Sequence, residues 1–211
     1  MRDADVRSAI CDHLVDQHSG DRDTLIIEEM GIWAGAVRID VAVINGEMHG
    51  FELKSARDTL SRLPSQRDLY GRVFNRVTLV VADKHQTKAM SLIPEWWGVI
   101  TAFELDGKVQ LRPFREAALN PEIDALQMAR LLWRDEALDC LARFGGTKGL
   151  KTATAERLAK EISERLPIDQ ICEEVRTTLK RRPNWLRQVL SDNRKVAISV
   201  DLHPLGSTAG C

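Results

Sequence analysis

Residues 38–54 read RIDVAVINGEMHGFELK, and this stretch decides the fold because it predicts two β-strands joined by a turn. Apolar residues alternate with other residues over 38–44 and again over 48–54, and Asn45 and Gly46 between them are typical turn residues. In strands of this phase Asp40, Glu52 and Lys54 share one face. The opposite face should pack on a core through its apolar residues, which are Ile39, Val41, Val43, Phe51 and Leu53.

The length of the turn decides which residues of this hairpin face each other. A strict two-residue turn sets Asp40 opposite Phe51 and directs the aspartate toward the apolar side. A three-residue connection, with Gly46 or Glu47 absorbing a bulge, sets Asp40 opposite Glu52, and we predict this register. Carboxylates on opposed residues, about 5 Å apart, repel by roughly 3 kcal/mol at an effective dielectric constant near 20. A positive group should therefore lie beside them.

Composition limits the class of protein. The chain has 211 residues, with 30 basic and 31 acidic side chains, so any nucleic-acid site must be local and not a property of the whole molecule. The four cysteines are far apart and form no CxxC pair, which indicates neither a zinc site nor a disulfide framework and favours the cytoplasm. No apolar run reaches the roughly 20 residues of a membrane span, so we expect no contact with a membrane.

The order of predicted elements indicates two parts and a tail. A helix over 3–16, a strand over 24–29, the hairpin, a helix from Pro64 to about Asn75, a strand over 77–82, a helix over 85–92 and a second hairpin give the order α-β-β-β-α-β-α-β-β. Only helices are predicted afterwards, the first beginning at Asn120 and Pro121. Trp133 lies in a helical pattern and is expected to be buried in the apolar core. The later helices are expected over 152–166, 168–182 and 183–193. We therefore predict domains over 1–115 and 116–202 and a flexible tail over 203–211.

The polar face of the first hairpin has the composition of a divalent-cation site. Mg²⁺ binds oxygen ligands, usually one or two carboxylates together with water and phosphate oxygens. Asp40 and Glu52 supply two carboxylates, and the backbone carbonyl of Leu53 supplies a third oxygen. Lys54 can orient or activate an attacking water and offset charge on a phosphate. This combination suits phosphodiester hydrolysis, and the plain alternative is a solvated polar face of an exposed hairpin.

The same residues resemble the signature of a nuclease superfamily. The pattern D-x(11)-E-x-K, formed by Asp40, Glu52 and Lys54 across a hairpin, is similar to the motif of the PD-(D/E)xK superfamily. The resemblance implies an α/β, restriction-endonuclease-like fold with an α-β-β-β-α-β core and a mixed sheet, here followed by a C-terminal helical bundle. Gln66 and Tyr70 resemble the QxxxY motif of RecB-like members. Ile39 departs from the pattern, because proline is usual there, and residues 1–115 also resemble a group of small bacterial proteins.

The resemblance implies a metal cofactor and a third acidic ligand. Some members carry this acid on the first strand or first helix, and here Glu29 fits best, with Glu28 and Asp5 as alternatives. The implied ligands of Mg²⁺ or Mn²⁺ are then Asp40, Glu52, the Leu53 carbonyl and Glu29. The implied assisting residues are Lys54, Gln66 and Tyr70.

Local charge agrees with a polyanionic substrate. The segment from Lys54 to Arg76 contains six basic and two acidic residues, which gives a net charge of +4. Arginine contacts to phosphates position a nucleic acid without reading its sequence. The alternative for each arginine is a solvated face or a structural ion pair.

Two functions are therefore expected as alternatives. The first is a Mg²⁺- or Mn²⁺-dependent deoxyribonuclease that acts in repair or in defence against foreign DNA. The second is a catalytically inactive nuclease-like module that binds DNA or another protein. In either case the C-terminal helices can pair two copies of the chain or recruit a protein partner.

Overall fold

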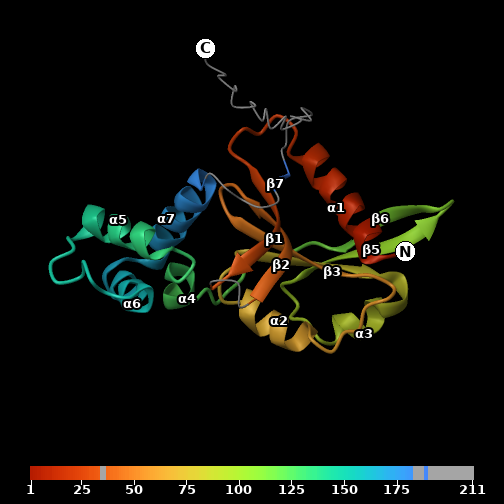
Figure 1. Cartoon of the computed structure of the whole chain (residues 1–211). Helices are drawn as coiled ribbons and strands as arrows, with labels where there is room; N and C mark the ends of the chain where they lie inside the picture. The colour runs from red at the N-terminus through yellow and green to blue at the C-terminus, as the bar shows by residue number, and fades with distance from the viewer. Residues whose placement is uncertain (34–36, 183–187, 190–211) are drawn as a thin grey trace, which may run out of the picture.

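A mixed β-sheet lies at the centre of the computed structural model, which describes residues 1–33, 37–182 and 188–189 (Figure 1). Its strand order is β6-β5-β4-β3-β2-β1-β7. Strand β4 pairs in parallel with both β3 and β5, and the other neighbours are antiparallel. The strands are β1 (Leu25–Ile32), β2 (Val37–Ile44), β3 (Met48–Lys54), β4 (Arg76–Ala82), β5 (Gly98–Leu105), β6 (Lys108–Arg115) and β7 (Gln188–Val189).

Helices cover both faces of this sheet. Helix α1 (Asp3–Gln17) packs on one face through Val6, Ile10 and Leu14, which recur at helical spacing. The other face is covered by α2 (Leu63–Tyr70) and α3 (Gln86–Met90), the latter preceded by the 3₁₀ turn η1 (Asp83–His85). No described helix is long and apolar enough to cross a membrane.

The C-terminal helices form a group beside the β1 and β2 end of the sheet (Figure 1). They are α4 (Ala125–Ala129), α5 (Arg134–Phe144), α6 (Ala155–Arg165) and α7 (Ile168–Arg181). Their buried side chains, such as Met128, Leu141 and Val175, belong to the same apolar cluster as the residues beneath α2. The α/β class, the mixed sheet and the α1-β1-β2-β3-α2-β4 order are thus confirmed, and the division into domains over 1–115 and 116–202 stays a prediction.

The β2–β3 hairpin adopts the predicted register. Val41 pairs with Phe51 and Ile44 with Met48, so one further step along the two strands leads to Asp40 and Glu52. The turn is closed by Asn45, whose backbone N–H donates to the Glu47 carbonyl and whose side-chain oxygen accepts the Glu47 N–H, each at 3.1 Å. The ladder ends at the pair of Ile44 and Met48, so the expected bulge at Gly46 or Glu47, within the turn, stays a prediction.

The expectation of one polar and one apolar face for this hairpin is wrong, first because both faces are packed and second because the alternation between the faces breaks at Asp40. Both faces are packed, because Ala42, Ile44 and Met48 are buried on the α2 side of the sheet. Ile39 also lies in that cluster, whereas Val41, Val43, Phe51 and Leu53 pack toward α1. The alternation is broken where β1 meets Asp40, since the β1–β2 ladder skips the Glu29–Asp40 step and Glu29 has φ 54°.

Three predicted helices differ from the structure. The helix expected over 64–75 ends at Tyr70, because Asn75 hydrogen-bonds to Met48 and begins the approach to β4. The helix expected from Asn120 begins instead at Ala125, with Asp124 as its cap, and the Asn120 side chain donates to the Gly71 and Phe74 carbonyls. Of the helix expected over 183–193, residues 188–189 instead form β7 beside β1. The rest of that segment and the 203–211 tail lie outside the described residues.

We expect Gly98→Ala to destabilise the sheet. A Cβ on Gly98 would lie 2.6 Å from Thr78 Oγ1 and 2.9 Å from the Ala117 backbone nitrogen, so the Thr78 side chain and the backbone at Ala117 must move. Urea denaturation should show a loss of about 1–3 kcal/mol in the free energy of unfolding. Gly46→Ala is the control, because nothing lies within 4 Å of its Cβ, and equal losses in the two variants would contradict the close approach.

Candidate active site

One cavity of about 600 Å³ brings the predicted site residues together at the ends of β1, β2 and β3. Helix α2 supplies its opposite wall. Among the residues that line it are Glu29, Asp40, Glu52, Lys54 and Gln66. Leu53 also lines the cavity, although its side chain packs toward α1, so its contribution to the wall is its backbone. Tyr70 lies behind the wall with no exposed surface.

Glu52 is the centre of a hydrogen-bond network that joins β3 to α2. It is 1% exposed, and its Oε1 accepts hydrogen bonds from Lys54 Nζ and from Gln66 Nε2, the latter at 2.7 Å. Its Oε2 accepts the Tyr70 hydroxyl at 2.8 Å. Gln66 Oε1 in turn accepts a bond from Lys54 Nζ at 3.1 Å, so the two predicted motifs form one connected unit.

The Asp40 side chain links β2 to β3 beyond the last backbone pair of their ladder. Its Oδ2 accepts the backbone N–H of Leu53 at 2.8 Å, which fixes the carboxylate next to the end of β3. Glu29, on the neighbouring strand, adopts a left-handed φ that is uncommon for a residue other than glycine. Since such conformations concentrate at functional sites, this distortion is a second mark of the same place in the sheet.

The charge of Asp40 acts on the neighbouring Glu52 carboxylate. Burial, with the nearby charge of Asp40, raises the pKa of Glu52 to about 7, although Lys54 and Tyr70 act in the opposite direction. Burial and the Glu52 charge raise the pKa of the Tyr70 hydroxyl, which therefore stays protonated and donates. The prediction that a positive group must accompany Asp40 and Glu52 is met by two cations of the chain, Lys54 and Arg7.

Arg7 of α1 is the site residue that the sequence did not single out. Its Nη2 lies 2.8 Å from Asp40 Oδ1, 2.9 Å from Glu29 Oε1 and 3.3 Å from Asp3 Oδ2. Its Nη1 donates to the Asp40 backbone carbonyl at 2.9 Å. The only signals in the sequence are its place next to buried Val6 and four residues after Asp3, and both are commonplace on an amphipathic helix.

The alternatives for the third acid occupy different places. Glu28 and Glu29 both border a hollow beside Cys11 and α1, but only Glu29 also lines the cavity, and it pairs with Arg7. Asp5 accepts the Arg2 backbone N–H at the start of α1 and does not line the cavity. Of the three, Glu29 is thus the one placed beside Asp40.

The oxygen atoms in the cavity are of the kind that a hard cation prefers, but in this structure they accept hydrogen bonds from protein groups. Carboxylate oxygens are the ligands that Mg²⁺ prefers, and Asp40 and Glu52 supply four of them. Each of the four accepts a hydrogen bond from Arg7, Leu53, Lys54, Gln66 or Tyr70. In the described ranges no three His, Cys, Asp or Glu side chains are placed to hold a metal ion.

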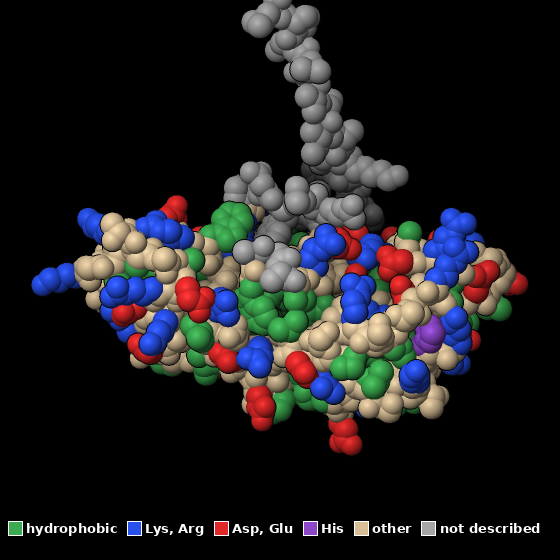
Figure 2. Space-filling model, turned by 60° about the horizontal axis from the view of Figure 1, so that its bottom comes forward, with side chains coloured by type: hydrophobic (Ala, Val, Ile, Leu, Met, Phe, Trp, Pro, Cys, Tyr) green, Lys and Arg blue, Asp and Glu red, His purple; other side chains and the backbone are tan. Residues whose placement is uncertain are grey.

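The basic residues after β3 do not form one continuous path. Arg62 lines the candidate cavity, but Arg67 and Arg72 line a separate hollow beside Trp96. Arg76 pairs with Glu47 at 2.7 Å. Basic and acidic side chains are interspersed over the face shown in Figure 2, so the net charge of this segment is divided between several places.

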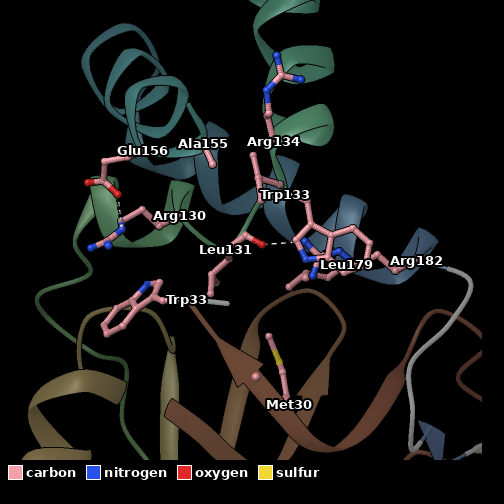
Figure 3. Close-up of a pocket in the computed structure, with 12 residues that line it drawn as sticks. Met30, Trp33, Arg130, Leu131, Trp133, Arg134, Ala155, Glu156, Leu179 and Arg182 are labelled. Atoms are coloured by element: carbon pink, nitrogen blue, oxygen red, sulfur yellow. Dashed lines mark hydrogen bonds and ion pairs between the residues drawn. The ribbon is translucent and has the colours of Figure 1, made fainter. Parts of the chain in front are cut away.

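A second cavity, of about 470 Å³, lies between β1 and the C-terminal helices (Figure 3). Arg130 pairs with Glu156 at 3.0 Å and lies over the Trp33 ring, and Arg182 lies over the Trp133 ring and donates to the Leu131 carbonyl. The Trp33 contacts, which include a hydrogen bond from its Nε1 to the Gln127 carbonyl at 3.1 Å, join the helices to the end of β1, and the other contacts hold the helices together. Trp133 is 61% exposed, so its predicted place in the core is wrong.

We expect Glu52 to make the metal-free protein less stable as pH rises. Its folded pKa of about 7 exceeds the ordinary glutamate value of 4.5, so the native state holds a proton that the unfolded chain has released between these pH values. The free energy of unfolding should fall across this window by about 3 kcal/mol. Glu52→Gln cannot titrate there and should lack this fall.

The measurement is urea denaturation of both proteins in EDTA at several pH values from 4.5 to 8. His49 titrates in an overlapping range, because burial and the charge of Arg76 lower its pKa to about 4. It is present in both proteins, so its effect cancels in their difference. A difference in unfolding free energy that is independent of pH would contradict the assignment to Glu52.

Comparison with known proteins gives a family. The model of the family described as Bacteriophage P4 protein cII matches residues 1–205. Protein cII of Enterobacteria phage P4 is 27% identical over 183 residues, which cover 84% of this chain and 68% of that protein.

Two solved structures are weakly similar. SPO1766, a protein of unknown function from Silicibacter pomeroyi, is 17% identical with TM-score 0.44, over 72% of this chain and 97% of that chain. SfsA of Pyrococcus furiosus, solved in complex with Ca²⁺, is 13% identical with TM-score 0.33, over 54% and 63%. Neither likeness bears on function, and it is the family match over nearly the whole sequence that decides: the chain belongs to the bacteriophage P4 protein cII family.

Proposed function

We propose that this protein is a Mg²⁺- or Mn²⁺-dependent nuclease that hydrolyses phosphodiester bonds of DNA. The observation that carries the proposal is the convergence of Lys54, Gln66 and Tyr70 on Glu52, with Asp40 beside it in the same cavity. Sequence motifs on a hairpin and on a separate helix are thereby joined by direct hydrogen bonds. Such a network supports catalysis because two carboxylates, of Glu52 and Asp40, and the Lys54 ammonium could all reach one substrate group.

The metal would be held by Asp40 and Glu52 with the Leu53 carbonyl, and Glu29 is the further acid at the rim. When bound, such an ion polarises a phosphate oxygen and lowers the pKa of a coordinated water. Lys54 is 4% exposed, so its ammonium acts in a desolvated setting where its charge is strongly felt. There it offsets negative charge that develops on the phosphate.

Gln66 and Tyr70 serve as positioning residues in this proposal. Gln66 bonds both Lys54 and Glu52, and it therefore fixes the distance between the ammonium and the carboxylate. The Tyr70 hydroxyl lies 2.6 Å from the Arg38 carbonyl and 2.8 Å from Glu52 Oε2. It ties the β2 and β3 ends of the site to the same point of α2.

The second candidate is a module of the same fold that binds DNA or a protein without cleaving it. It is favoured by one observation, which is that every carboxylate oxygen of Asp40 and Glu52 already accepts a hydrogen bond from the protein. The C-terminal helices are then a surface for a protein partner or a second copy of the chain. A role in DNA repair or in defence against foreign DNA belongs to the nuclease proposal.

The nuclease proposal predicts that Lys54→Ala and Asp40→Asn abolish DNA cleavage. Linear, circular and single-stranded DNA are incubated with the purified chain in Mg²⁺ or Mn²⁺, and the products are separated on gels. Each variant should lose about 100-fold or more of the rate, since removal of one electrostatic contributor typically costs that much. The matched controls are Lys160→Ala and Asp135→Asn, whose side chains are 68% and 90% exposed and lie outside the cavity.

Two results would decide against cleavage by this site. Cutting that persists at the parental rate in Lys54→Ala would show that the activity comes from elsewhere. The second result is a parent protein that cuts none of the three DNA forms. If band-shift assays then show that it binds DNA, or if calorimetry shows no heat on Mn²⁺ addition, the non-enzymatic module is the better account.

A further inference from the structure

A single nitrogen atom of Arg7 lies among the oxygens of three carboxylates. Nη2 is 2.8 Å from Asp40, 2.9 Å from Glu29 and 3.3 Å from Asp3, and the arginine side chain is only 14% exposed. This atom carries two protons, which is fewer than the three acidic partners around it. The arrangement is therefore held by charge as well as by directional hydrogen bonds.

The groups around this nitrogen are of the kind that surround a bound metal cation. Carboxylate oxygens from three elements, α1, β1 and β2, converge on it, and Mg²⁺ takes oxygen ligands of this kind. Asp40 is shared, because it is also the carboxylate beside Glu52 in the proposed metal site. Arg7 and a divalent ion thus require the same oxygen, Asp40 Oδ1.

Arg7 also has an anchor that does not involve a carboxylate. Its Nη1 donates to the Asp40 backbone carbonyl at 2.9 Å. The guanidinium can therefore release Asp40 Oδ1 by a small rotation while it stays attached to β2. This makes exchange between two cations at Asp40 possible without unpacking α1 from the sheet.

We propose that the Arg7 guanidinium holds the place of a divalent cation, so that Arg7 and the metal ion bind Asp40 in alternation. This inference rests on the proposed metal-dependent function and adds its regulation, because the site is closed by an internal cation until metal displaces it. The apparent affinity for metal is then lowered by the fraction of molecules in which Arg7 occupies Asp40.

Calorimetry with Mn²⁺ alone, on the full chain without DNA, tests the competition. Arg7→Met and Arg7→Gln remove the charge and should tighten Mn²⁺ binding about tenfold or more, as expected when Arg7 blocks the site at least nine-tenths of the time. Arg7→Lys keeps the charge and should tighten it less. Arg62→Met is the matched control, since it removes a positive charge from the same cavity and should change the affinity by no more than about threefold.

The outcomes separate this inference from the proposed function. If the parent binds Mn²⁺ and the Arg7→Met and Arg7→Gln proteins bind it equally or more weakly, Arg7 only positions the carboxylates and the competition is overturned, while the metal site stands. An equal gain in Arg62→Met also overturns it, because the effect would then be one of general charge. If neither the parent nor any Arg7 variant binds Mn²⁺, the metal site and the competition both fail.

A measurement on the unaltered protein keeps the inference testable if the Arg7 variants fold poorly. In ¹⁵N-labelled protein, the guanidinium N–H resonances of Arg7 should shift or broaden as Mg²⁺ is added, because their carboxylate acceptor is lost. The resonances of Arg143, which pairs with Glu174 on the C-terminal helices, serve as the internal reference. Arg7 resonances that stay unchanged at saturating Mg²⁺ would overturn the competition.

Discussion

The burial of the Glu52 carboxylate is the constraint on which the rest of the structure depends. A buried charge is tolerated only when it is paired and hydrogen-bonded, and Glu52 obtains its partners from Lys54 on its own strand and from Gln66 and Tyr70 on α2. These bonds fix the position of α2 on the sheet. Through the Tyr70 hydroxyl they also reach the Arg38 carbonyl of β2. The contacts that assemble the central part of the fold are therefore the same contacts that assemble the candidate site.

The sequence predicts this centre well because its signals are local. Alternation on two short strands, a turn of limited length and a polar pair one helical turn apart determine the hairpin register and bring Glu52, Lys54, Gln66 and Tyr70 together. The sequence could not predict Arg7, whose role depends on how α1 crosses the sheet. Nor could it predict the left-handed φ of Glu29, which breaks the alternation and moves Ile39 to the other face.

The C-terminal helices show a different limit of sequence-based prediction. Periodicity identified α6 and α7 and merged α4 with α5 into the one helix expected from Asn120, but it does not indicate what their apolar faces cover. In the structure those faces join the apolar cluster beneath α2. The contact of Arg130 with the Trp33 ring adds to this junction, and the contact of Arg182 with the Trp133 ring holds the helices to one another (Figure 3). An exposed tryptophan such as Trp133 has the same helical spacing as a buried one, so only the tertiary structure distinguishes them.

An acidic site of this kind must be compatible with folding before any metal arrives. Asp3, Glu29 and Asp40 lie around one point, and two carboxylates about 5 Å apart repel by roughly 3 kcal/mol at an effective dielectric constant near 20. Without a cation, such repulsion would be a large part of the total stability of a domain. Arg7 supplies the missing charge from α1, a helix that must pack on the sheet in any case through Val6 and Ile10. An internal cation thus offsets the charge of these carboxylates in the folded chain, and a divalent ion bound at Asp40, as proposed, would have to displace a contact that folding has already made.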